Sequence, residues 1–211
     1  MKTKFAIGCL VQWYECNIIE KYVDSLKDAI EQYDGQVIVD FTVVGNQDLE
    51  KCISENQMNK CIDKIESICN FGNVRYTDDL HTIADYRRLF NTNYCDQVDV
   101  LIWGESDALL PKQMFTILDN LHHISLQNNN PKYLAFFGTC KMWDDSWKVL
   151  EHPKFTDKLH SDNKDDWWSV NYTMTKDEMN KINDETTELD VKVLPQHKFN
   201  GCGLVISSEV I

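Results

Sequence analysis

The sequence predicts an α/β fold in which a mainly parallel sheet is flanked by helices. Short apolar runs alternate with amphipathic segments through residues 5–139, as in a series of β-α units. Several of these runs are rich in β-branched residues and end at glycine, asparagine or aspartate. In addition, the run that starts at Val98 ends on Glu105 and Asp107, and α/β sheets bind ligands beyond the carboxyl ends of their strands.

The first two strands and the helix between them follow from apolar periodicity. Residues 5–11 and 36–44 read as strands, and Gly45-Asn46 ends the second one. Residues 17–33 read as an amphipathic helix that Asp34-Gly35 closes, with the glycine as a left-handed cap. One face of this helix carries Ile18, Ile19, Tyr22, Val23, Leu26, Ile30 and Tyr33.

The next elements continue the alternation. A second helix ends around Cys69, and residues 74–76 form a short strand. Thr77-Asp78-Asp79 supplies N-cap chemistry for a helix that runs to about Tyr94. After the acidic strand, Pro111 suits the first turn of a helix because proline lacks the N–H that would be unsatisfied there. That helix runs to about residue 124, and residues 133–137 read as another strand.

The last third of the chain has a different character. Residues 141–190 are rich in Asp, Asn, Lys and Trp with weak periodicity, which predicts long loops and one helix around residues 175–183. A strand is expected at 189–194. Phe199-Asn200-Gly201-Cys202-Gly203 then precedes a final strand at 204–206. We therefore expect a single domain over residues 1–211 with a loop-rich C-terminal third.

Length and charge exclude several classes of protein. The chain has 211 residues, and its net charge of −13 argues against duplex nucleic acid as a partner. No stretch approaches the 18 apolar residues of a transmembrane helix, and the N-terminal apolar run is too short for a signal peptide. The 8 cysteines contain no Cys-x-x-Cys pair, so we expect reduced core thiols and a cytoplasmic protein.

The acidic tip of the predicted central strand suits a divalent cation. Glu105 and Asp107 lie two residues apart, just past the strand, and can face one hard cation that also takes water and phosphate oxygens. The sequence has no Gly-x-Gly-x-x-Gly after the first strand, no P-loop, no Gly-x-Ser-x-Gly and no His-Glu-x-x-His. If the ligand is a phosphate ester, a metal must therefore neutralise it.

Four motifs in the same order resemble the GT-A class of nucleotide-sugar glycosyltransferases, most nearly the family 2-like group. Trp103-Gly104-Glu105-Ser106-Asp107 takes the place of the acidic DXD motif at the end of the central strand. Residues 15–26 are similar to the segment after the first strand, and Arg87-Arg88-Leu89-Phe90-Asn91 to the helix before the acidic strand. Residues 199–203 resemble the glycine pair of the acceptor-side loop.

The resemblance implies a Rossmann-like sheet, a nucleotide-sugar donor, and Mn²⁺ or Mg²⁺ on the donor diphosphate. Residues 1–140 would form the nucleotide-sugar-binding half and residues 141–211 the acceptor-side half. The expected metal ligands are Asp107, Glu105 and His197. The expected donor-binding residues are Trp103, Gly104, Glu105, Asn46, Arg87 and Arg88.

The chain also departs from that pattern. The family's second strand ends in an Asp-Asp-x-Ser motif that binds uridine, and this chain has Val43-Val44-Gly45-Asn46-Gln47 there. The resemblance therefore does not identify the nucleobase of the donor. The family's general base normally lies beyond the glycine-pair loop, whereas this sequence stops at Ile211. Either the chain is part of a longer enzyme, or the base lies upstream at Asp144 or Asp145, between tryptophans that could stack on sugars. The family 2-like resemblance favours inversion.

Other interpretations remain open for these residues. In purely structural terms, Asp107 would cap a helix, Trp103 would be core, Arg87 and Arg88 would be exposed charges, and Asp144-Asp145 would be a solvated loop. A sugar-phosphate nucleotidyltransferase is a second enzyme class, although its glycine- and arginine-rich loop is replaced here by residues 12–15. A non-catalytic nucleotide- or carbohydrate-binding module is a third interpretation.

Overall fold

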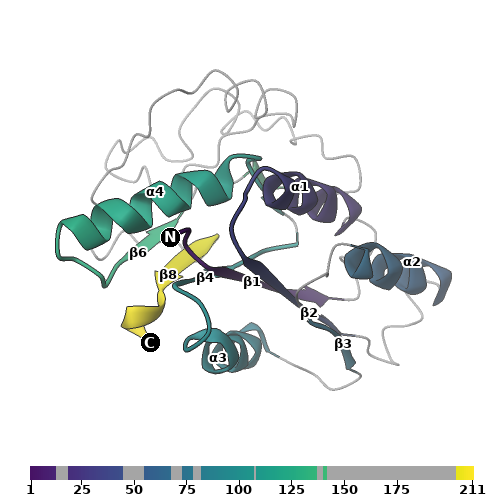
Figure 1. Cartoon of the computed structure of the whole chain (residues 1–211). Helices are drawn as coiled ribbons and strands as arrows, with labels where there is room; N and C mark the ends of the chain where they lie inside the picture. The colour runs from purple at the N-terminus through teal and green to yellow at the C-terminus, as the bar shows by residue number, and fades with distance from the viewer. Residues whose placement is uncertain are drawn as a thin grey trace, which may run out of the picture.

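The computed structural model describes residues 1–12, 19–44, 55–67, 73–77, 82–106, 108–136, 140–141 and 203–211. A six-stranded sheet in the order β3-β2-β1-β4-β8-β6 forms its centre (Figure 1). The strands are β1 (Phe5–Gln12), β2 (Val37–Val44), β3 (Asn73–Thr77), β4 (Val100–Trp103), β6 (Leu134–Phe136) and β8 (Leu204–Ser207). Two further short strands, β5 (Ala108–Leu109) and β7 (Cys140–Lys141), pair with each other.

The predicted mainly parallel sheet is confirmed. β1 pairs in parallel with β2 on one side and β4 on the other, and β2 pairs in parallel with β3. β8 is the reversed strand, because it runs antiparallel to both β4 and β6. Apolar periodicity predicts a strand at 204–206 but carries no information on its direction or its neighbours.

Helices cover both faces of the sheet, as predicted. They are α1 (Ile19–Glu31), α2 (Glu55–Glu66), α3 (Ile83–Tyr94) and α4 (Met114–Gln127), and a 3₁₀ turn, η4, spans Ser208–Val210. α1, α2 and α4 lie on one face and α3 on the other (Figure 1). β1 serves both cores because successive side chains alternate: Phe5, Ile7 and Cys9 pack with α1 and α4, whereas Ala6 and Leu10 pack with α3.

Two predicted helix starts are wrong by several residues. α3 is capped by Thr82, whose Oγ1 accepts from the Asp85 N–H at 3.1 Å and donates to the Asp85 carboxylate at 2.6 Å. Thr77 belongs instead to β3, which pairs with β2. α4 begins at Met114 because the chain after Pro111 first makes a turn, closed by the Met114 N–H on the Pro111 carbonyl at 3.0 Å.

The predicted left-handed cap at Gly35 is also wrong. Among the described glycines, the positive φ occurs at Gly203, with φ 59°. Gly35 is small for another reason, since a Cβ there would lie 2.3 Å from the ring of Tyr33. α1 ends at Glu31, and the ring of Tyr33 lies close against Gly35.

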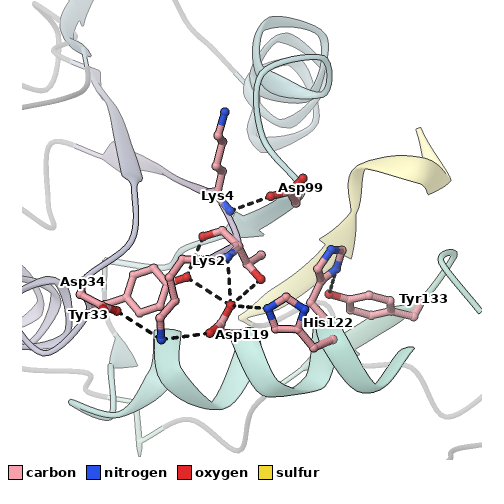
Figure 2. Close-up of polar contacts among 10 residues, drawn as sticks. Lys2, Lys4, Tyr33, Asp34, Asp99, Asp119, His122 and Tyr133 are labelled. Atoms are coloured by element: carbon pink, nitrogen blue, oxygen red, sulfur yellow. Dashed lines mark hydrogen bonds and ion pairs between the residues drawn. The ribbon is translucent and has the colours of Figure 1, made fainter. Parts of the chain in front are cut away.

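A buried polar cluster ties the N-terminal segment to α4 at the amino-terminal end of β1. Asp119 of α4 accepts from the backbone N–H and the hydroxyl of Thr3, at 2.9 and 2.6 Å. Lys2 bridges Asp119 and Asp34, at 3.3 and 3.2 Å (Figure 2). Tyr33 donates to the Thr3 carbonyl at 2.7 Å. This cluster lies at the opposite end of β1 from the predicted ligand site, so its role is to hold the fold.

Several predicted features lie outside the described residues. They are the helix at 175–183, the strand at 189–194 and most of the loop at 199–203. The proposed division at residue 140 thus stays a prediction. None of the helices in the described ranges combines the length and apolarity that a membrane span needs.

Candidate functional site

The candidate site lies where the order of strands reverses. The chain passes from β1 to β2 to β3 at one edge of the sheet and then returns to β4 on the other side of β1. In open α/β sheets, ligands bind outside the carboxyl ends of the strands at such a reversal. Here those ends are Gln12 of β1 and Trp103 of β4, and Gly104 and Glu105 follow directly.

Gly104 is required by close packing at this point. Its N–H donates to the Gly8 carbonyl at 2.7 Å, which continues the pairing of β4 with β1 for one more residue. A Cβ at position 104 would lie 2.3 Å from the hydroxyl of Tyr22. Only a glycine therefore lets the backbone of the acidic motif pass over α1 at this distance.

The Tyr22 hydroxyl is itself unusual. Tyr22 is fully buried, and its oxygen has no hydrogen-bond partner in the described part of the chain. Burial, with smaller contributions from Cys9 and Glu105, raises the pKa of Tyr22 well above its ordinary value. Tyr22 is therefore protonated, and its hydroxyl lies beneath Gly104 unsatisfied by any of the described residues, a feature that apolar periodicity alone does not reveal.

Main-chain and serine contacts anchor the segment that follows Glu105. The Ala108 N–H donates to the Glu105 carbonyl at 3.0 Å. The Leu110 N–H donates to Ser25 Oγ at 3.1 Å, and this hydroxyl donates in turn to the Tyr22 carbonyl of α1. Ala108 is thus tied back to Glu105, and Leu110 is tied to α1.

Four side chains meet at the end of β4. Arg87 of α3 lies with its guanidinium carbon 4.6 Å from the centre of the Trp103 ring. One guanidinium nitrogen is 3.4 Å from Glu105 Oε1. The Trp103 indole N–H donates to Asn91 Oδ1 at 2.9 Å, one helical turn beyond Arg87. The side chains of Arg87 and Glu105 keep only 20% and 16% of their surface exposed, so their charges interact more strongly than a fully solvated pair.

The two arginines predicted to bind donor phosphates lie in different places. Arg88 is 76% exposed and pairs with Asp85 at 2.9 Å along the surface of α3. Consecutive residues of a helix point about 100° apart, so both cannot face the same site. Arg87 is the one that α3 turns toward the acidic motif.

A buried carboxylate sets the rotation of α3. Asp40 of β2 is completely buried and accepts hydrogen bonds from the hydroxyls of Tyr86 and Tyr94, at 3.0 and 2.7 Å. These tyrosines lie on the sheet side of α3 and fix the direction in which Arg87 projects. The sequence carried a signal for this contact, because a lone aspartate inside the apolar run Val-Ile-Val-Asp-Phe-Thr-Val-Val needs buried partners.

The described residues hold one part of the predicted metal site. Glu105 lies there, whereas Asp107 and His197 lie outside the described residues, as do Asn46, Asp144 and Asp145. No group of three His, Cys, Asp or Glu side chains converges within the described ranges. A carboxylate oxygen suits Mn²⁺ or Mg²⁺, so the type of donor at Glu105 fits such a cation. Arg87 already pairs with it, however, and a cation would have to compete.

Comparisons with known proteins give a distant structural likeness. No protein-family model matches the chain, and no curated protein matches its sequence. Among solved structures, the chain is similar to the mannosyltransferase PcManGT from Pyrobaculum calidifontis, in complex with GDP-Man and Mn²⁺. The identity is 10% and the TM-score is 0.39, over 56% of this chain and 32% of that protein. The match thus spans about a third of the mannosyltransferase.

Proposed function

We propose that the protein is a metal-dependent glycosyltransferase that moves a sugar from a nucleotide-sugar donor to an acceptor hydroxyl. The observation that carries the proposal is the partly buried Arg87–Glu105 pair at the end of β4, 3.4 Å apart, where the order of strands reverses. A cationic group and an oxygen donor side by side suit a ligand that is both anionic and metal-bound, as a nucleoside diphosphate is.

The proposed donor side combines residues of β4 and α3. Trp103, Gly104 and Glu105 line the donor together with Asn46, and Arg87 meets its phosphates. Arg88 is the weaker of the two arginine candidates, because it lies exposed beside Asp85. Asp107, Glu105 and His197 would hold Mn²⁺ or Mg²⁺, which stabilises charge on the departing nucleoside diphosphate.

The proposed acceptor side rests on sequence alone. Asp144 or Asp145 would take the proton of the acceptor hydroxyl, and the transfer would invert the anomeric carbon. Residues 1–140 would then form the donor half of a single domain and residues 141–211 the acceptor half. We also propose a cytoplasmic, reducing setting, in keeping with Cys9 as a core residue and Cys95 as a free thiol.

The proposal is tested by titrating a panel of UDP- and GDP-sugars into the protein with and without Mn²⁺, while hydrolysis of each sugar is followed. We expect one donor to bind and to be slowly hydrolysed only when Mn²⁺ is present. Asp107→Ala should weaken this binding by about tenfold or more. Asp96→Ala is the matched control, because Asp96 is an exposed carboxylate in the turn after α3.

Two results would contradict the proposal. If no nucleotide sugar binds or is cleaved with Mn²⁺ present, the protein is not a transferase of this kind. If Asp107→Ala binds the donor as well as Asp96→Ala does, the acidic motif is not the metal site.

A further inference from the structure

The position of Arg87 does not depend on Glu105 alone. Its guanidinium stacks on Trp103 at 4.6 Å, and Trp103 is itself held by Asn91. An arginine over an indole ring gains cation–π attraction that is independent of its anionic partner. Arg87 can therefore exchange one anion for another while its side chain stays on the ring.

α3, the helix that carries Arg87, is also held by contacts with the sheet. The Tyr86 and Tyr94 hydroxyls both bond to the buried Asp40 carboxylate, and Phe90 between them is fully buried against the sheet. α3 thus cannot rotate easily. Any change at Arg87 is confined to its own long side chain, at the end of β4.

The contact between Arg87 and Glu105 is not an optimal ion pair. The nitrogen–oxygen distance is 3.4 Å, whereas charge-assisted hydrogen bonds between these groups are typically 2.7–2.9 Å. A phosphate offers several oxygens in the fork geometry that arginine binds best. A diphosphate ligand is therefore a stronger partner for Arg87 than this carboxylate is.

We propose that Arg87 is a counterion of Glu105 in the resting protein and that a diphosphate draws Arg87 away, which makes the carboxylate more available to a divalent cation. Diphosphate and cation then bind with positive coupling that passes through this side-chain pair. The inference rests on the proposed function for its choice of ligand. It adds that, without diphosphate, Arg87 suppresses cation binding at Glu105.

The test measures protein-bound Mn²⁺ by equilibrium dialysis, without ligand and with inorganic pyrophosphate, and a protein-free cell corrects each value for the Mn²⁺–pyrophosphate complex in solution. We expect Arg87→Gln to bind Mn²⁺ alone about tenfold more tightly than the wild type, within the range usual for such couplings. Pyrophosphate should strengthen Mn²⁺ binding less in Arg87→Gln than in the wild type. Arg88→Gln removes the same charge from the next residue and should leave both values unchanged.

Glu105→Gln separates this pair from a general change in charge. In the Glu105→Gln background, adding Arg87→Gln should no longer tighten Mn²⁺ binding. The proposal is overturned if the two arginine variants behave alike, if the gain persists without Glu105, or if no variant binds Mn²⁺. Should Arg87→Gln fail to fold by circular dichroism, Arg87→Lys replaces it. Lysine keeps the counterion, so Mn²⁺ alone should bind as in the wild type, while the coupling to pyrophosphate should shrink.

The outcome is separable from that of the proposed function. Coupling to pyrophosphate without binding of any nucleotide sugar would retain the Arg87–Glu105 exchange and reject the transferase. Metal-dependent cleavage of a nucleotide sugar, together with identical Mn²⁺ binding by Arg87→Gln and Arg88→Gln, would retain the transferase and reject the Arg87–Glu105 exchange.

Discussion

At the scale of single residues, Gly104 of the acidic motif lies over the buried hydroxyl of Tyr22. The Tyr22 oxygen is buried beneath Gly104 and has no hydrogen-bond partner in the described ranges. An unsatisfied buried polar group costs about 1–3 kcal/mol relative to a satisfied one. The site therefore contains a local destabilisation that a phenylalanine would avoid.

We predict that Tyr22→Phe raises the free energy of unfolding by about 1 kcal/mol, because it removes the unsatisfied oxygen without changing the ring. Urea denaturation followed by fluorescence measures the difference. Tyr33→Phe is the matched control, since the Tyr33 hydroxyl donates to the Thr3 carbonyl at 2.7 Å. That variant should lose stability. Equal losses in both variants would mean that the Tyr22 hydroxyl has a partner after all.

Residue-scale contacts also mark the limit of what the sequence predicts about the site. The sequence indicates Glu105 and the arginine pair, but it cannot separate Arg87 from Arg88. That choice depends on the rotation of α3, which is set by the contact of Tyr86 and Tyr94 with Asp40 on a strand far away in the chain. The local spacing of residues does not predict side-chain roles that depend on such long-range contacts.

At the scale of elements, α4 and the N-terminal segment are joined by one buried carboxylate. Burial opposes ionisation of Asp119, but hydrogen bonds from Thr3 and the nearby Lys2 outweigh it and lower its pKa below the ordinary 3.8. A carboxyl with a lowered pKa stabilises the folded state fully above its unfolded pKa. This contribution is lost as the pH falls through the lowered value.

We predict that Asp119→Asn lowers the free energy of unfolding at neutral pH by about 2 kcal/mol, in the range for hydrogen bonds to a charged group. The loss should shrink as the pH falls below 3.8 and through the lowered pKa of the folded protein, because the wild-type carboxyl then becomes protonated as well. Urea melts at several pH values measure this. Asp28→Asn is a suitable control because Asp28 is exposed on α1. A loss that stays constant with pH would show that charge is not involved.

Element boundaries show why local signals predict the fold better than its details. The apolar periods of β1, β2 and α1 predict these elements to within two residues. The start of α3 is different, since Thr77-Asp78-Asp79 and Thr82 both have capping chemistry. Pairing of β3 with β2 takes Thr77 into the sheet, and Thr82 is the residue that caps α3.

At the scale of the whole molecule, the last described strand holds the sheet together. β8 lies between β4 and β6, and it is the sheet neighbour of β6 in the described part of the chain. All four of its residues are buried, including Ser207, which hydrogen-bonds to the Pro131 carbonyl. The Ser208 N–H and hydroxyl both donate to the Asp99 carbonyl at 3.0 Å, next to the start of β4.

We predict that a chain ending at residue 203 loses cooperative unfolding, because β4 and β6 then lack the strand that joins them. A chain ending at Ser208 keeps β8 and should unfold nearly as the wild type does, since Glu209, Val210 and Ile211 are exposed. Near-UV circular dichroism and urea melts compare the two. A cooperative transition in the shorter chain would contradict this role of β8.

The position of β8 late in the sequence has a consequence for folding during translation. A ribosome releases β1 to β4 long before residues 204–207, so the open edge of β4 must wait for a partner that is still to be translated. An unpaired strand edge invites pairing with other chains. The nascent protein is thus most vulnerable to aggregation just before its synthesis reaches β8, and slowing translation there would prolong that exposure.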